Sequence, residues 1–149
     1  MSTSTVDKPG ALTPKMANRI RMASFGTLTM LFIQFVLGAA YGLYGTAPTS
    51  GKSVGMFSSP LLAIHVVLGI LLIITAITLV VRAVQARHTP SVAATVTGLL
   101  AILGAFGTGS SFAQNGSNGA SLAMAVLAAV AMLCYATILV ILGKPAAGS

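Results

Sequence analysis

Two polar residues inside apolar segments are the first candidates for chemistry in this 149-residue chain. His65 is the only histidine within an apolar run, and Gln34 lies in the middle of another run. An ionisable side chain at membrane depth is a candidate functional residue, because removing it from water is costly. A neutral imidazole can ligate haem iron or form a hydrogen bond with a neighbouring helix.

Gly69 follows His65 by one helical turn and would leave a gap beneath the imidazole. One interpretation is a cofactor site formed by His65 and Gly69, in which the gap takes a flat porphyrin such as haem b. A methionine (Met30, Met124 or Met132) would then be available as a further ligand. The interpretation that we favour is structural: His65 bonds to a neighbouring helix, and Gly69 permits close packing.

A wider polar cluster is predicted around His65. Gln34 and Tyr41 share one face of the first apolar segment, while Thr108 and Ser111 lie near the end of the third. The functional interpretation is a small-molecule, quinone or haem site that opens to the outside. The structural interpretation, which we favour, is a set of interhelical hydrogen bonds worth about 0.6 kcal/mol each.

The scarcity of acidic residues excludes several kinds of chemistry. The chain has one acidic residue, Asp7, and one cysteine, Cys134. Paired acid–base catalysis, a carboxylate metal site and proton-coupled antiport through a buried carboxylate all need acids that are missing. We therefore predict no catalytic residues and no metal site, and an enzyme is not favoured.

Hydropathy predicts the elements that must position these residues. The chain is 56% hydrophobic and only 6% charged, whereas soluble domains average about 25% charged residues. Each apolar run has the roughly 20 residues that a helix needs to cross about 30 Å of hydrocarbon. We predict an all-α integral membrane protein with four transmembrane helices, at about 20–45, 60–82, 91–113 and 119–143.

The basic residues predict how these helices are oriented. Seven of the eight lie on one side of the predicted membrane, namely Lys8, Lys15, Arg19, Arg21, Arg82, Arg87 and Lys144, and only Lys52 lies on the other. The positive-inside rule then places both termini in the cytoplasm and the protein in the plasma (inner) membrane. Residues 1–18 are predicted to be a disordered cytoplasmic arm, 19–144 the transmembrane domain and 145–149 a short tail.

Small residues recur on one face of each segment, which is typical of contacts between helices in lipid. With short loops, the simplest arrangement is an up-down-up-down bundle. We expect an accessory or oligomeric component of a membrane complex, with the bilayer and other subunits or further copies as partners. The alternatives are a haem- or quinone-binding electron-transfer protein that uses His65, and an oligomeric channel for a small solute. Nucleic-acid binding is not expected, because the basic residues are not clustered on one helical face.

The stretch His65-Val-Val-Leu-Gly69, together with the four-helix layout, is loosely similar to b-type cytochromes and haem A synthase. The resemblance covers a few residues of one helix. These families use pairs of histidines on separate helices. The second histidine here, His88, is predicted to lie at the opposite end of the same helix as His65, so no function is carried over.

Overall fold

Four α-helices make up almost all of the part of the chain that the computed structural model describes, residues 13–45, 55 and 57–143. They are α1 (Pro14–Tyr44), α2 (Pro60–Gln85), α3 (Thr89–Asn115) and α4 (Asn118–Gly143). Each helix is long and apolar enough to cross a membrane. The prediction of an all-α protein with four candidate membrane spans is thus confirmed.

Two helices begin earlier than hydropathy predicts. α1 begins at Pro14 rather than near residue 20, and α3 at Thr89 rather than 91. Backbone hydrogen bonding, not hydropathy, decides where a helix begins, and both helices have a proline in the first turn, where its missing N–H is not needed. Residues 14–18 are therefore helical, not disordered as predicted. Residues 1–12 of the predicted arm and the predicted tail lie outside the described residues.

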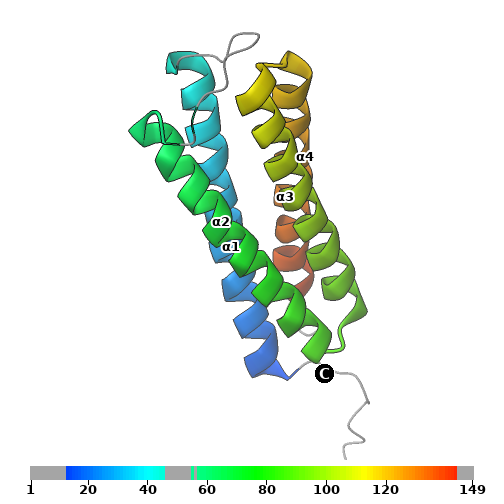
Figure 1. Ribbon diagram of the computed structural model, residues 1–149. Coiled ribbons are helices and arrows are strands. Elements are labelled where there is room, and N and C mark those ends of the chain that lie inside the picture. Colours follow the sequence, from blue (N-terminus) through cyan, green and yellow to red (C-terminus); the bar gives the residue numbers. More distant parts are fainter. Residues whose placement is uncertain (1–12, 46–54, 56, 144–149) are drawn as a thin grey trace, which may run out of the picture.

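The helices form a closed ring. α1 packs against α2 and α4, and α3 packs against the same two helices, whereas the diagonal pairs make no close contact within the described part of the chain. Consecutive helices run antiparallel, so α1 begins and α4 ends at the same end of the bundle (Figure 1). A central space shared by all four helices follows from this arrangement.

Local signals explain the ends of the helices. Gly116 follows α3 in the left-handed conformation (φ 63°), and its N–H donates to the Phe112 carbonyl at 2.8 Å. Arg87 takes the same conformation (φ 51°) between α2 and α3, a position where glycine would be less strained. At the start of α2, the Ser59 hydroxyl accepts a hydrogen bond from the Leu62 N–H at 3.2 Å.

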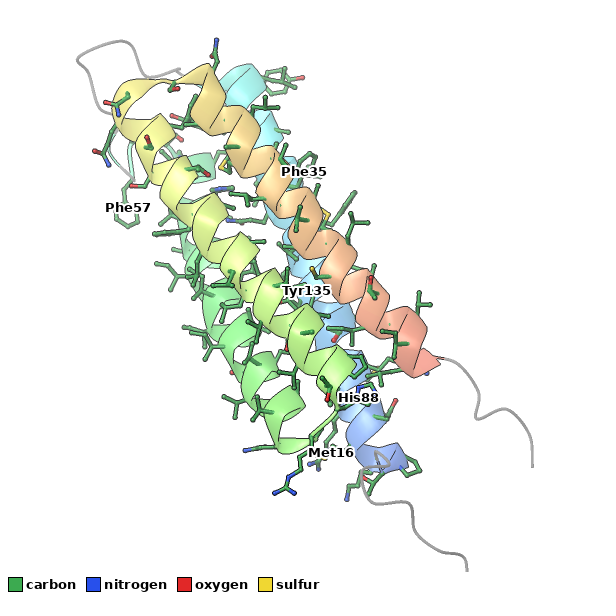
Figure 2. All side chains as sticks on the ribbon, turned by 90° about the vertical axis from the view of Figure 1, so that its right-hand side faces the viewer. Met16, Phe35, Phe57, His88 and Tyr135 are labelled. Atoms are coloured by element: carbon green, nitrogen blue, oxygen red, sulfur yellow. The ribbon has the colours of Figure 1, made fainter. Side chains whose placement is uncertain are left out.

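The bundle is tightly packed only in the half that contains the α2–α3 turn. Small residues at the contacts let the backbones approach: Ala76, Ala83 and Ala131 have no exposed surface. Tyr135 is also fully buried, and its ring lies against Gly98. In Figure 2, Met16 and His88 mark the end of this half, and Tyr135 lies between that end and Phe35. We define this region as the packed half.

Toward the α3–α4 turn the helices separate. In Figure 1 the pair α1–α2 diverges from the pair α3–α4 toward the upper end. The buried residues of the four helices stop at Leu31, Gly69, Ile102 and Ala131 on this side. We define the region beyond them as the open half. The candidate site residues His65 and Gln34 both belong to it.

Gly98→Ala should destabilise the bundle by about 1–3 kcal/mol, because a well-packed core resists added methyl groups. A Cβ there would lie 3.0 Å from the Tyr135 ring, which cannot move in its buried position. The measurement is thermal unfolding in detergent, followed by circular dichroism. The control is Gly107→Ala in the same helix, where a Cβ would meet nothing within 4 Å. Equal unfolding temperatures for the two variants would contradict the packing described.

Candidate functional site

A cavity of 370 Å³ occupies the open half of the bundle. All four helices contribute to its wall, and most of the lining side chains are apolar. Its volume falls within the range of about 300–1,000 Å³ that is typical of small-molecule pockets. Leu31, Leu72 and Ile102 close its inner end, where the packed half begins. No charged side chain is among the described residues that line it.

Gln34 connects α1 to α2 at the wall of this cavity. Its Nε2 donates a hydrogen bond to the backbone carbonyl of His65, with an N–O distance of 2.6 Å. The amide can lie there because the facing residue is Gly69: a Cβ at Gly69 would be 3.0 Å from Gln34 Nε2. The space at Gly69 is therefore filled by the Gln34 amide, rather than left empty beneath the imidazole.

The imidazole of His65 packs against α1 at Gly38. A Cβ at Gly38 would lie 3.2 Å from His65 Cε1 and 3.8 Å from Nδ1. Nδ1 is buried and has no hydrogen-bond partner among the described residues, and the same is true of Gln34 Oε1. Buried polar atoms are seldom left unpaired. Ser24 Oγ and Tyr135 OH in the packed half also lack partners among the described residues, but His65 Nδ1 and Gln34 Oε1 belong to side chains that line the cavity.

Met124 of α4 extends across the centre of the cavity. Its Sδ lies 3.0 Å from the position that a Cβ would take at Gly109 of α3, and its Cε lies 4.0 Å from the corresponding position at Gly38 of α1. The side chain therefore reaches two helices that do not contact each other, and it is close to the His65 ring. Methionine is unbranched and has three rotatable bonds, so it can fill an irregular space and can also change its conformation when the contents of that space change.

Two phenylalanines connect the cavity with the outside of the bundle. Phe35 of α1 and Phe106 of α3 line the cavity, yet 42% and 43% of their surfaces are exposed. Their exposed neighbours are apolar as well, including Phe32, Val36 and Leu103. The cavity wall thus continues into the apolar outer surface of the helices.

The predicted polar cluster is brought together only in part. His65, Gly69, Gln34 and Tyr41 all line the cavity. Thr108 does not: its hydroxyl donates to carbonyls of its own helix, to Gly104 at 3.0 Å and Ala105 at 3.1 Å. Ser111 is exposed on the outside of α3.

Other polar residues that the sequence analysis did not single out line the cavity instead, and these are Ser110, Gln114 and Ser121. For α3, helical periodicity could have predicted which of these polar residues face the cavity. Gly109 faces the cavity, and a residue two positions further along a helix is rotated by about 200°. Ser111 must therefore point away, whereas Ser110 is rotated by only about 100° and stays at the edge of the cavity.

The histidines and the cysteine do not converge on a metal site. His88 lies at the other end of α2, where its Nδ1 is 2.8 Å from the Ser91 hydroxyl. Cys134 is in the packed half and is partly buried. The described residues contain no group of three or more His, Cys, Asp or Glu side chains that could hold a metal ion.

Comparison of the chain with models of protein families, with curated proteins and with solved structures gave no match. Its function is therefore argued from the cavity and its lining residues.

Gly69→Ala should break the contact between Gln34 and the His65 carbonyl and destabilise the protein by about 1 kcal/mol, within the range measured for hydrogen bonds between membrane helices. In a Gln34→Ala background the amide is absent, so the same substitution should be nearly neutral. A double-mutant cycle on unfolding free energy in detergent measures this coupling. Additive effects of the two substitutions would show that Gly69 does not accommodate Gln34.

Proposed function

We propose that this protein is a membrane-embedded binding protein that holds a small, largely apolar molecule inside its helix bundle. The observation that carries the proposal is the 370 Å³ cavity among the four helices, with His65 and Gln34 on its wall. Apolar walls with a few convergent polar groups are the usual composition of a ligand site. The His65 imidazole and the Gln34 amide are polar side chains on this otherwise largely apolar wall, and each can form a hydrogen bond with a ligand.

The orientation belongs to the same proposal. Every Lys and Arg of the described residues lies at the end of the packed half, and these are Lys15, Arg19, Arg21, Arg82 and Arg87. By the positive-inside rule this end is cytoplasmic, so both termini are inside, the helices pass up-down-up-down, and the cavity lies in the outer half of the plasma (inner) membrane. The site is then open to molecules from the outer leaflet.

Haem binding is less well supported than a smaller ligand. From the sequence, Gly69 could either leave a gap for a porphyrin or permit close packing of helices. In the structure, the Gln34 amide occupies the space that a porphyrin would use. Met124 is near His65, but both side chains converge on Gly38 rather than facing each other across an empty slot. An intense Soret band in the visible spectrum of the purified protein would favour haem over the ligand proposed.

A second candidate is the accessory or oligomeric role expected from the sequence. Gly26 is exposed on α1 and is not part of the cavity lining, and a Cβ there would meet nothing within 4 Å. Exposed glycines let a further helix approach closely in lipid. Copurification of a second membrane protein or of a stable dimer, lost in Gly26→Leu, would support this role. A monomer without partners in mild detergent would count against it, and against a channel formed by several copies.

Filling the cavity should remove the ligand. Ala128 lines the cavity, whereas the next residue, Ala129, is exposed on the outside of α4. Small molecules extracted from purified protein with organic solvent can be quantified by mass spectrometry. We expect one compound to accompany the wild type and Ala129→Phe, and at least tenfold less of it to accompany Ala128→Phe.

Circular dichroism of each sample establishes that the variants are folded, and Ala125→Phe, also in the cavity wall, provides a second way to fill it. If the wild type carries nothing beyond the background of lipid and detergent, and added apolar compounds do not bind either, the proposal is wrong.

The proposed orientation predicts which end of the bundle a reagent outside the cell can reach. In a Cys134→Ser background, Asn115→Cys at the α3–α4 turn should react with a membrane-impermeant maleimide on intact cells. Thr89→Cys, at the basic end, should react only after the cells are permeabilised. Both residues are exposed, so access and not burial decides the result. The reverse labelling pattern would show that the protein has the opposite orientation in the membrane.

A further inference from the structure

The two ring nitrogens of His65 indicate which chemical group a ligand offers them. A neutral imidazole has one N–H donor and one acceptor. Nδ1 is buried against Gly38 without a partner. Orphaned buried N–H donors are rarer than under-satisfied acceptors. We therefore assign the proton to Nε2, a choice inferred from the surroundings of the ring.

This assignment distinguishes a hydrogen-bonded ligand from a metal-bound one. A histidine that ligates a metal through Nε2 almost always donates its other N–H to a carboxylate, a carbonyl or water. Nδ1 of His65 is in contact with neither a carboxylate nor a carbonyl acceptor within the described residues. Nε2–H is thus suited to donate to a ligand, and the matching group on the ligand is an acceptor such as a carbonyl oxygen.

The route into the cavity indicates that the ligand is soluble in lipid. Phe35 and Phe106 line the cavity and are also part of the apolar outer surface of their helices. A molecule dissolved in the hydrocarbon can pass between the helices at these side chains without crossing a polar surface. Their rings also favour a flat aromatic or quinonoid ring, which packs against them face to edge or offset.

Met124 makes room for such a ring. Its side chain occupies the centre of the cavity, where it touches the Gly38 and Gly109 positions on opposite helices. Three rotatable bonds allow it to swing aside without disturbing the backbone. The space that it leaves is next to the His65 imidazole, where a planar group would lie.

We infer that the cavity takes the head group of a lipid-soluble quinone, with one ring carbonyl accepting a hydrogen bond from His65 Nε2. The inference rests on the proposed function and adds the chemical class of the ligand. It joins three features of the site: the N–H assigned above to His65 Nε2, apolar walls that are continuous with the lipid, and a flexible side chain at the centre. Ser110, Gln114 and Ser121 are further polar residues in the cavity lining.

The test compares two compounds with the same decyl chain and a flat six-membered ring, of which only the quinone has ring carbonyls as hydrogen-bond acceptors. Purified protein in lipid nanodiscs is titrated with decylbenzoquinone and with decylbenzene by calorimetry, and empty nanodiscs correct for partition into lipid. The quinone should bind the wild type at least tenfold more tightly. His65→Phe should reduce quinone affinity about tenfold, equivalent to 1.4 kcal/mol, and leave decylbenzene unchanged. His88→Phe, at the other end of the bundle, should bind both compounds like the wild type.

The outcomes separate the two proposals. Equal affinity of the two compounds for the wild type overturns the quinone class but leaves a cavity that binds apolar molecules. Binding of neither compound, together with no copurified molecule in the wild type, overturns the proposed function as well. If His65→Phe fails to fold, the comparison of the two compounds on the wild-type protein still decides the class of ligand.

Discussion

Close packing at small residues is the constraint on which this structure depends. Lipid gives helices no hydrophobic reason to associate, so contacts between backbones must hold them together. In the packed half these contacts occur at Ala76, Ala83, Gly98 and Ala131, and Tyr135 fills the centre between them. The ring of helices is fixed there, and the same helices can diverge beyond it. The cavity is the consequence of a bundle that is held at one end.

The Gln34 side chain holds α1 and α2 together within the open half. It bonds α1 to the His65 carbonyl on α2 and keeps these two helices together beyond the packed half. This bond uses one end of the amide and leaves Oε1 without a partner. An unpaired polar group is expensive away from water, and this one belongs to a side chain that lines the cavity. Gln34 therefore has two roles: its amide N–H connects two helices, and its side chain forms part of the cavity wall.

The distribution of charge complements this division. The described basic residues are all at the end of the packed half, and none lies near the cavity. The cavity is thus an apolar space with a few neutral hydrogen-bonding groups. The free-energy cost of transferring a neutral ligand from the lipid into it is therefore small. Among the described lining residues an ion would find no opposite charge to compensate its desolvation. The apolar walls extend to the outer surface at Phe35 and Phe106.

The sequence by itself determined the four helices and the faces that they bury. Hydropathy depends on local composition, so the spans were predicted to within a few residues, apart from the start of α1. Helical periodicity also placed Gln34, Tyr41, His65 and Gly69 on inward faces. Only the tertiary structure decided what these residues contact: the Gly69 space contains the Gln34 amide, Thr108 bonds to its own helix, and Ser111 points outward. Contacts of this kind depend on how helices far apart in the chain rotate and diverge. A single helix's pattern contains no information on that geometry. For the same reason the sequence left a binding site as the less favoured of two interpretations, and it did not predict the path of Met124 across the cavity.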